Sequence, residues 1–271
     1  MKVYLTLVSS LTLLFGLQAF AYIPPSQFIV KSWVNKHSGM KALKLRSMVT
    51  EYTSDKPTPV HFKTVSVYNA EAQKLKSWAI NDFDKVLYST ERDLTSLSPL
   101  SKLLFLSDLK EVIKTLKSSG VPVQTEAELL KFKTELERRE SEQESLIRWN
   151  GTVVWALGAA DSKQEPESAQ LWFEKDLFLP LRFLFRTEGV GDLYDVRLEN
   201  YRFTREFPYP RGISLRKKGA GIMFSEQIVD ISLNSDAQAS KRPLGSGFTE
   251  LGQNSPSELR NLIQNYYDII R

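Results

Sequence analysis

Side chains that could perform chemistry are few in this sequence and lie far apart. Neither of its two histidines, His37 and His61, has a carboxylate or a second histidine at a metal-ligand spacing, and there is no cysteine. The carboxylates gather in the charged runs ERRE and EKD, which are typical of solvated faces. The glycines of GVGDL and KKGAG lack the spacing and context of a phosphate-binding loop. We therefore expect no metal, no cofactor and no catalytic residue.

One enzymatic alternative stays open. The two carboxylates of a sugar-cleaving enzyme need not be close in sequence, so an exported hydrolase with dispersed carboxylates is a third interpretation, behind the two binding functions given below. It requires two carboxylates that converge in a cleft.

Apolar and aromatic residues, in contrast, alternate regularly along predicted strands. In QLWFEKDLFLPLRFLF, residues 170–185, Leu181, Phe183 and Phe185 have one parity, while Arg182 and Arg186 have the other. We predict that the three apolar residues face the concave side of a sheet and that both arginines face water. The pattern leaves open whether that side is an ordinary core filled by side chains or a hollow apolar pocket.

The elements that would position these residues are strands before and after a helical middle. The runs 41–52, 59–69, 74–80 and 85–90 alternate like strands and are separated by polar turns, which is typical of an antiparallel meander. Strands resume with GTVVWALG and continue to QIVDISLN. A phase slip of the apolar pattern near residues 199–200 predicts a β-bulge that curves the sheet.

Helix signals occur at both ends and in the middle of the chain. Ser98 followed by Pro99 begins a predicted amphipathic helix that Gly120 ends, and a capping box follows at residues 125–128. We interpret residues 98–141 as a helical insertion. A short helix after Pro25 and a last helix with a capping box from Ser255 to Glu258 complete the helical elements. The predicted fold class is mostly β with α, a curved antiparallel sheet with helices over its concave face.

The first residues, MKVYLTLVSSLTLLFGLQAFA, combine a basic start, an apolar middle and a small-residue cleavage site. We expect residues 1–21 to be a cleaved signal peptide and residues 22–271 to form a single domain. An exported protein that has no cysteine is more typical of the bacterial periplasm than of a eukaryotic secretory route. Lipoprotein-type anchoring requires a cysteine at the cleavage site, so we expect no lipid anchor. With 36 basic and 32 acidic residues and no dense basic block, nucleic-acid binding is not indicated.

Residues 145–234 resemble the LolA/LolB-like family of periplasmic lipoprotein carriers. The resemblance is carried by WNGTVVWALGA, QLWFEKDLFLPLRFLF, VRLENYRFTREFPYPRGISLRKKG and IVDISLN. It implies an open, unclosed antiparallel β-barrel whose concave side, covered by helices, holds acyl chains. It also implies the role of a soluble carrier that receives lipid or lipoprotein cargo from an inner-membrane donor and passes it to an outer-membrane acceptor.

The leading hypothesis is therefore a noncatalytic carrier of acyl chains, and the alternative is a periplasmic regulatory or interaction module of the same fold that binds an envelope protein. Leu100, Leu103 and Leu104 are expected to form part of the lid. The residues expected to line the cavity are Val153, Trp155, Leu157, Leu171, Phe173, Leu181, Phe183, Phe185, Val196 and Leu198.

Overall fold

The computed structural model of the chain describes residues 24–52, 59–81, 86–158, 167–186, 192–204, 207–234 and 257–271. The predicted signal peptide, residues 1–21, lies outside these ranges, and so does Ser255 of the last predicted capping box. Among the helices within them, none is both long enough and apolar enough to span a lipid bilayer.

Eleven strands form one sheet in the order β4-β3-β2-β1-β13-β12-β9-β8-β7-β6-β5, and every neighbouring pair is antiparallel. Their bounds are β1 Ala42–Glu51, β2 Val60–Asn69, β3 Lys74–Ile80, β4 Val86–Asp93, β5 Ser145–Trp149, β6 Thr152–Leu157, β7 Gln170–Glu174, β8 Pro180–Arg186, β9 Leu193–Glu199, β12 Gly212–Lys217 and β13 Ile222–Leu233. A separate two-stranded sheet pairs β10, Arg202–Thr204, with β11, Phe207–Tyr209.

The large sheet is open and curved. β4 and β5 end the strand order and do not pair with each other among the described residues, so the sheet does not close into a barrel. Register shifts interrupt four strand pairings, at Arg46/Ser47, Ala79/Ile80, Trp172/Phe173 and Leu215/Arg216. Such irregularities bend a strand and increase its twist. The predicted fold class, an open antiparallel sheet with helices on its concave side, is confirmed.

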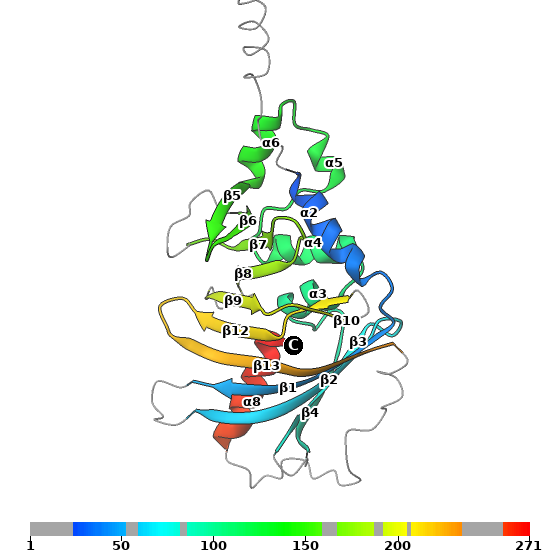
Figure 1. Cartoon of the computed structure of the whole chain (residues 1–271), viewed down its shortest axis with the longest axis vertical. Helices are drawn as coiled ribbons and strands as arrows, with labels where there is room; N and C mark the ends of the chain where they lie inside the picture. Colours follow the sequence, from blue (N-terminus) through cyan, green and yellow to red (C-terminus); the bar gives the residue numbers. More distant parts are fainter. Residues whose placement is uncertain are drawn as a thin grey trace, which may run out of the picture.

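The described helices are α2 Ser26–Val34, followed by the 3-10 turn η1 Asn35–His37, then α3 Pro99–Phe105, α4 Leu109–Ser118, α5 Glu126–Leu129, α6 Glu135–Glu142 and α8 Ser257–Ile270. Helices α2, α3, α4 and α8 pack against one side of the sheet, whereas Figure 1 shows α5 and α6 beyond its β5 end. Figure 1 shows α8 behind β13 and β1, and aromatic contacts from Tyr266 to Phe62 and Phe224 fix it there. Helices α3 to α6 all lie between β4 and β5 in the chain.

The single helix predicted from Ser98 to Gly120 is two helices, and that prediction was wrong. The predicted start is confirmed, because the Ser98 hydroxyl accepts a hydrogen bond from the Ser101 amide and Pro99 is the first helical residue. The chain then becomes extended at Leu106, and the carboxylate of Asp108 caps α4 by accepting from two amides of its first turn. Asp108 therefore begins a second helix at a point where the apolar pattern of the sequence continues without a break.

Two further expectations about the strands need correction. The sequence pattern predicted no strand at residues 145–149, yet β5 is there and pairs with β6. The two strands are joined by the turn Asn150–Gly151, whose φ angles are +47° and +83°. Asn-Gly is the preferred pair for such a hairpin turn. The phase slip near residues 199–200 is not a bulge: β9 ends at Glu199, Asn200 has φ +56°, and β10 belongs to the second sheet.

Candidate functional site

The candidate site is the helix-covered concave interior of the large sheet. Its main hydrophobic cluster joins the inward residues of the strands to apolar faces of α2, α3, α4 and α8. The residues from the predicted cavity and lid that belong to this cluster are Trp155, Leu157, Leu171, Phe173, Phe183, Phe185, Val196, Leu198, Leu100, Leu103 and Leu104, all buried. The fold brings them together, and a role in binding cargo stays a prediction.

Two predicted lining residues lie elsewhere. Val153 has the parity of Trp155 but is half-buried and does not belong to the main cluster. Leu181 packs on the opposite face of the sheet, against Val154, Ala156 and Trp172, so its placement in the cavity was wrong. The cause is a register shift: Trp172 pairs with Arg182, whereas the next residue pairs with Pro180, so Leu181 is an extra residue in β8.

Arg182 also departs from its prediction. It was expected to face water, but it is 6% exposed. Its guanidinium donates two hydrogen bonds to the Asp195 carboxylate, at 2.8 and 2.7 Å, and stacks over Trp172 with 4.6 Å from Cζ to the ring centroid. The ion pair and the stacking compensate for its burial on the outer face of the sheet. Arg186, at the end of β8, is exposed as predicted.

Helix α2 is held over the interior by one specific hydrogen bond. The indole Nε1 of Trp33 donates to the carbonyl of Leu103 on α3 at 2.8 Å, and Trp33 is fully buried. Leu103 lies in the last turn of α3, where carbonyls have no partner within the helix. Trp33 therefore stabilises this packing in two ways. It buries apolar surface, and it donates a hydrogen bond to the Leu103 carbonyl, which links α2 to α3.

The lower half of the interior, under α8, contains a buried polar cluster that sequence reasoning missed. Arg271 and Glu226, both at most 3% exposed, form an ion pair. The Ser47 hydroxyl donates to Glu226 at 2.6 Å, and Arg271 Nε donates to the Ser66 hydroxyl at 3.3 Å. Burial lowers the pKa of Arg271, but Glu226 and the neighbouring Tyr266, Tyr209 and Tyr267 together raise it more, so the net pKa is above the ordinary value. Ser47, Thr64 and Ser66, on inward positions of β1 and β2, were the available signal.

A surface groove of about 1060 Å3 reaches the edge of the interior between α2, α4 and α5. Leu109 and Ile113 of α4 line it, and Ile113 also belongs to the main hydrophobic cluster. Apart from Ala127, the remaining lining residues are polar, namely Gln27, Lys31, Ser107, Asp108, Lys110, Lys114, Lys117, Thr125 and Glu126. An apolar chain with an anionic or polar head could therefore lie with its apolar part on α4 and its head among the lysines.

Two carboxylates do converge, but in a closed cluster. Arg138 pairs with Glu142 and Glu144, and the Ser26 hydroxyl at the start of α2 donates to Glu142. The side chains of Glu142 and Glu144 are 0% and 1% exposed. Burial, followed by the hydrogen bond and the charge of Glu142, raises the pKa of Glu144 to about 9. The cluster fastens α2 to α6, and its carboxylates are out of reach of a substrate.

Metal chemistry has no visible support either. His37 is fully buried with an edge-to-face contact to Trp33, and burial lowers its pKa to about 3. Within the described ranges, no group of three or more His, Asp or Glu side chains could hold a metal ion.

No family model matches this chain, and no curated protein matches it. Among solved structures it is similar to a LolA superfamily protein from Nitrosomonas europaea, with 10% identity, a TM-score of 0.46, and coverage of 81% of this chain and 98% of that one. It is also similar to an outer membrane lipoprotein-sorting protein domain from Vibrio parahaemolyticus, with 10% identity, a TM-score of 0.44, and coverage of 89% and 97%.

A third solved structure is a DUF1329 family protein from Desulfovibrio piger, with 10% identity, a TM-score of 0.42, and coverage of 78% of this chain and 92% of that one. Two of these three structures are thus named for the LolA superfamily or for outer membrane lipoprotein sorting.

Proposed function

We propose that this protein is a noncatalytic periplasmic carrier that takes up the acyl chains of a lipid or lipoprotein between its curved sheet and its helices. The observation that carries the proposal is the continuous apolar interior, which runs from the strands to α4 and meets the surface groove at Ile113. Each methylene moved out of water contributes about 0.8 kcal/mol, so an acyl chain needs such an interior to cross an aqueous compartment.

Uptake in this proposal requires a helix to move. The predicted lining residues Leu157, Leu171, Phe173, Phe183 and Phe185 are fully buried by protein side chains. A close-packed interior has no room for an acyl chain. Cargo therefore replaces the apolar face of a helix, and α2 is the candidate because it borders the groove through Gln27 and Lys31. The same exchange makes release possible, because the returning helix competes with the cargo.

A chain-length series of fatty acids tests this proposal. If the chain is buried, affinity rises with each added methylene, by up to about fourfold for 0.8 kcal/mol. Ala127→Trp fills the groove from an exposed position and is expected to weaken binding, whereas Ala72→Trp, at an exposed turn between β2 and β3, is the matched control. Affinity that does not depend on chain length, or equal binding by both variants, would contradict the carrier proposal.

Transfer between an inner-membrane donor and an outer-membrane acceptor is part of the same proposal. It predicts that cargo bound to the purified protein moves to vesicles that display an acceptor, and that it stays bound when the acceptor is omitted.

The alternative, an interaction module that binds an envelope protein, is favoured by one observation. Leu130 at the end of α5 and Leu136 in α6 are 83% and 66% exposed, within the predicted insertion 98–141. Exposed apolar side chains on one segment are typical of a protein-binding surface. A double variant, Leu130→Ser with Leu136→Ser, should lose partner binding and keep fatty-acid binding if both functions exist. Loss of fatty-acid binding in this variant would contradict that separation.

A further inference from the structure

A group of basic side chains on the outer face of the sheet has no role in the proposed carrier function. Arg182 on β8, Arg197 on β9 and Arg216 on β12 lie on three neighbouring strands. The register places Arg182 opposite Arg197, and Asp195 opposite Arg216. Because side chains alternate along a strand, all four extend from the same face, away from the main core. The relative positions of these four side chains are thus set by the pairing of regular strands.

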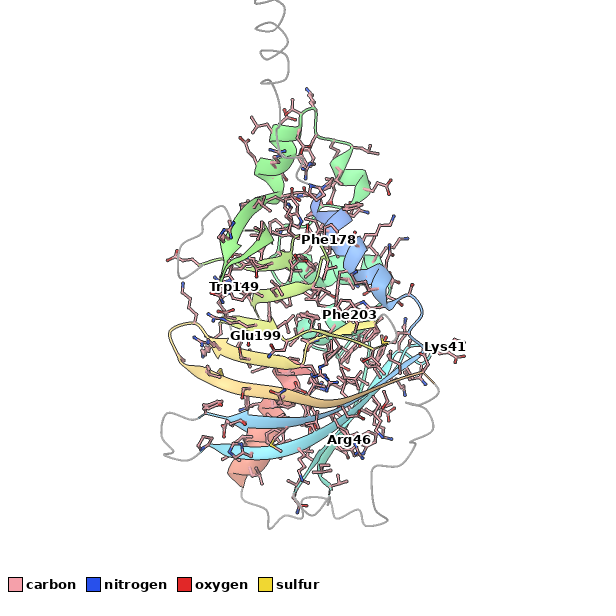
Figure 2. All side chains as sticks on the ribbon, viewed as in Figure 1. Lys41, Arg46, Trp149, Phe178, Glu199 and Phe203 are labelled. Carbon is pink, nitrogen blue, oxygen red and sulfur yellow. The ribbon has the colours of Figure 1, made fainter. Side chains whose placement is uncertain are left out.

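These side chains line a cavity of about 130 Å3, called the outer cavity here. Its apolar wall is made by Leu184 and Leu193, which are 2% and 5% exposed. Lys217 at the end of β12 and residues 218–220 in the turn to β13 close another side. Trp149, labelled in Figure 2, stands at the sheet edge with the Arg197 guanidinium 5.9 Å from its ring centroid. The outer cavity is therefore a preformed depression on regular structure.

The outer cavity has an excess of positive charge. Five basic residues line it, namely Arg182, Arg197, Arg216, Lys217 and Lys218. Asp195 is the carboxylate in its lining, and both of its oxygens already accept from Arg182 at 2.8 and 2.7 Å. Lys217 is paired with Asp192 at 2.7 Å. Among the described residues, two carboxylates against five cations leave an excess of three positive charges around the cavity.

Two guanidinium donors in this lining lack an acceptor. The Nε atoms of Arg197 and Arg216 are buried and have no hydrogen-bond partner among the described residues. Arg197 Nε lies 3.8 Å from the Asp195 carboxylate, which is too far for a hydrogen bond. Leaving a buried charged donor unsatisfied is costly. Burial lowers the pKa of Arg197 despite the opposing charge of Asp195, and the positive charges of Arg216 and Arg182 lower it further.

We propose that the outer cavity binds a phosphate-type oxyanion, held by the guanidinium groups of Arg197 and Arg216. Guanidinium groups match the oxygens of phosphate in paired hydrogen bonds, and a bound oxyanion supplies the acceptors that both Nε atoms lack. The oxyanion can belong to a free phosphate or to the headgroup of an anionic lipid. The site is on the face opposite the hydrophobic interior, so this inference does not depend on the carrier proposal.

The test follows the Nε–Hε NMR signals of the arginines in the full chain while inorganic phosphate or pyrophosphate is added in a phosphate-free buffer. We expect saturable shifts of Arg197 and Arg216. Arg211 is an internal control, because its Nε is also buried without a partner but does not line the outer cavity. Absence of saturable shifts, or equal shifts of Arg211, would overturn the proposal.

Two double variants that each remove two positive charges distinguish binding at the outer cavity from a nonspecific effect of net charge. Arg197→Gln with Arg216→Gln should weaken phosphate binding about tenfold or more, because two charge-assisted hydrogen-bond donors are lost. Lys41→Gln with Lys175→Gln removes the same charge from exposed positions outside the lining and should leave binding unchanged. Equal weakening in both double variants would refute a specific site. Both variants are first checked for an unchanged thermal unfolding midpoint.

Vesicle co-sedimentation then distinguishes the two sources of the oxyanion. Vesicles of phosphatidylcholine are compared with vesicles that also contain phosphatidylglycerol. Binding to the anionic vesicles that requires Arg197 and Arg216, and not the control lysines, identifies a lipid headgroup. Phosphate binding without such vesicle binding identifies a soluble phosphate compound. If neither probe binds through these arginines, the proposal is wrong.

Discussion

Replacing Trp33 with phenylalanine removes the indole donor that holds α2 against α3 and retains an aromatic ring in the core. The carbonyl of Leu103 loses its partner at the end of α3. A buried group left unsatisfied costs about 1–3 kcal/mol, and the smaller ring adds a further loss of packing. We expect the free energy of unfolding to fall by at least that amount, as measured by urea denaturation.

The change should also favour uptake of an apolar probe, because the lost contact exists only while α2 covers the interior. At the lower limit of 1 kcal/mol, the population with α2 displaced rises about fivefold. The assay is the initial rate and amplitude of fluorescence gain with N-phenylnaphthylamine under native conditions. Both quantities should increase in the variant.

Trp172→Phe is the matched control. Its Nε1 donates to the side-chain oxygen of Gln170 at 3.0 Å and the ring is buried, but Trp172 lies on β7 outside the main hydrophobic cluster and does not hold α2. We expect a comparable loss of stability with unchanged probe uptake. If uptake does not rise in Trp33→Phe, or rises equally in both variants, displacement of α2 is not the route of entry and the reasoning is refuted.

Three further predictions concern the buried charges. Arg271→Met leaves Glu226 buried without its cation and should cost about 3–5 kcal/mol in urea unfolding, and combining it with Glu226→Gln should recover part of that loss. A cost below 1 kcal/mol would show that the pair is not buried in solution. His37 has a pKa lowered to about 3 in the folded protein, so its contribution to stability is present above pH 6.5 and lost as pH falls towards 3. His37→Leu should flatten this acid slope, and an unchanged slope would contradict the burial of the ring. Glu144, with its pKa raised to about 9, binds its proton more tightly when folded, so stability falls as pH rises from 4.5 through 9. Glu144→Gln should remove that fall, and its persistence would assign the pH dependence to another group.

The sequence predicted the strands well wherever apolar alternation was uninterrupted. β1, β2 and β3 lie within the predicted runs because inward and outward residues alternate along each, although Val65, Trp78 and Ile80 form a small apolar cluster on the outer face of β2 and β3. Alternation failed at Leu181, where an extra residue shifts the parity of β8 by one position. A parity pattern contains no information on which strand residue lacks a partner opposite it. Arg182 does lie on the outer face, as its parity predicts, but Asp195 and Trp172 bury it there, and alternation along one strand does not reveal these partners.

The interior was harder to predict because its energetics depend on partners far apart in the chain. Arg271 and Glu226 are 45 residues apart, and Trp33 and Leu103 are 70 residues apart. Each residue alone resembles a surface charge or an ordinary core aromatic. The three leucines predicted for the lid are buried on α3, because a helical stripe of period 3.6 is a local property, and their role as a lid stays a prediction. The N-cap role of Asp108 was also local, but it was masked by the apolar stripe that continues through it.

The most direct test of the carrier function is the mass of the protein recovered from an exported compartment, compared under native and denaturing conditions. The account predicts a mass excess in the native spectrum that disappears on denaturation, with acyl lipid in the extract. A native mass equal to that of the bare polypeptide, together with no uptake of added lipid or acylated peptide, would contradict it.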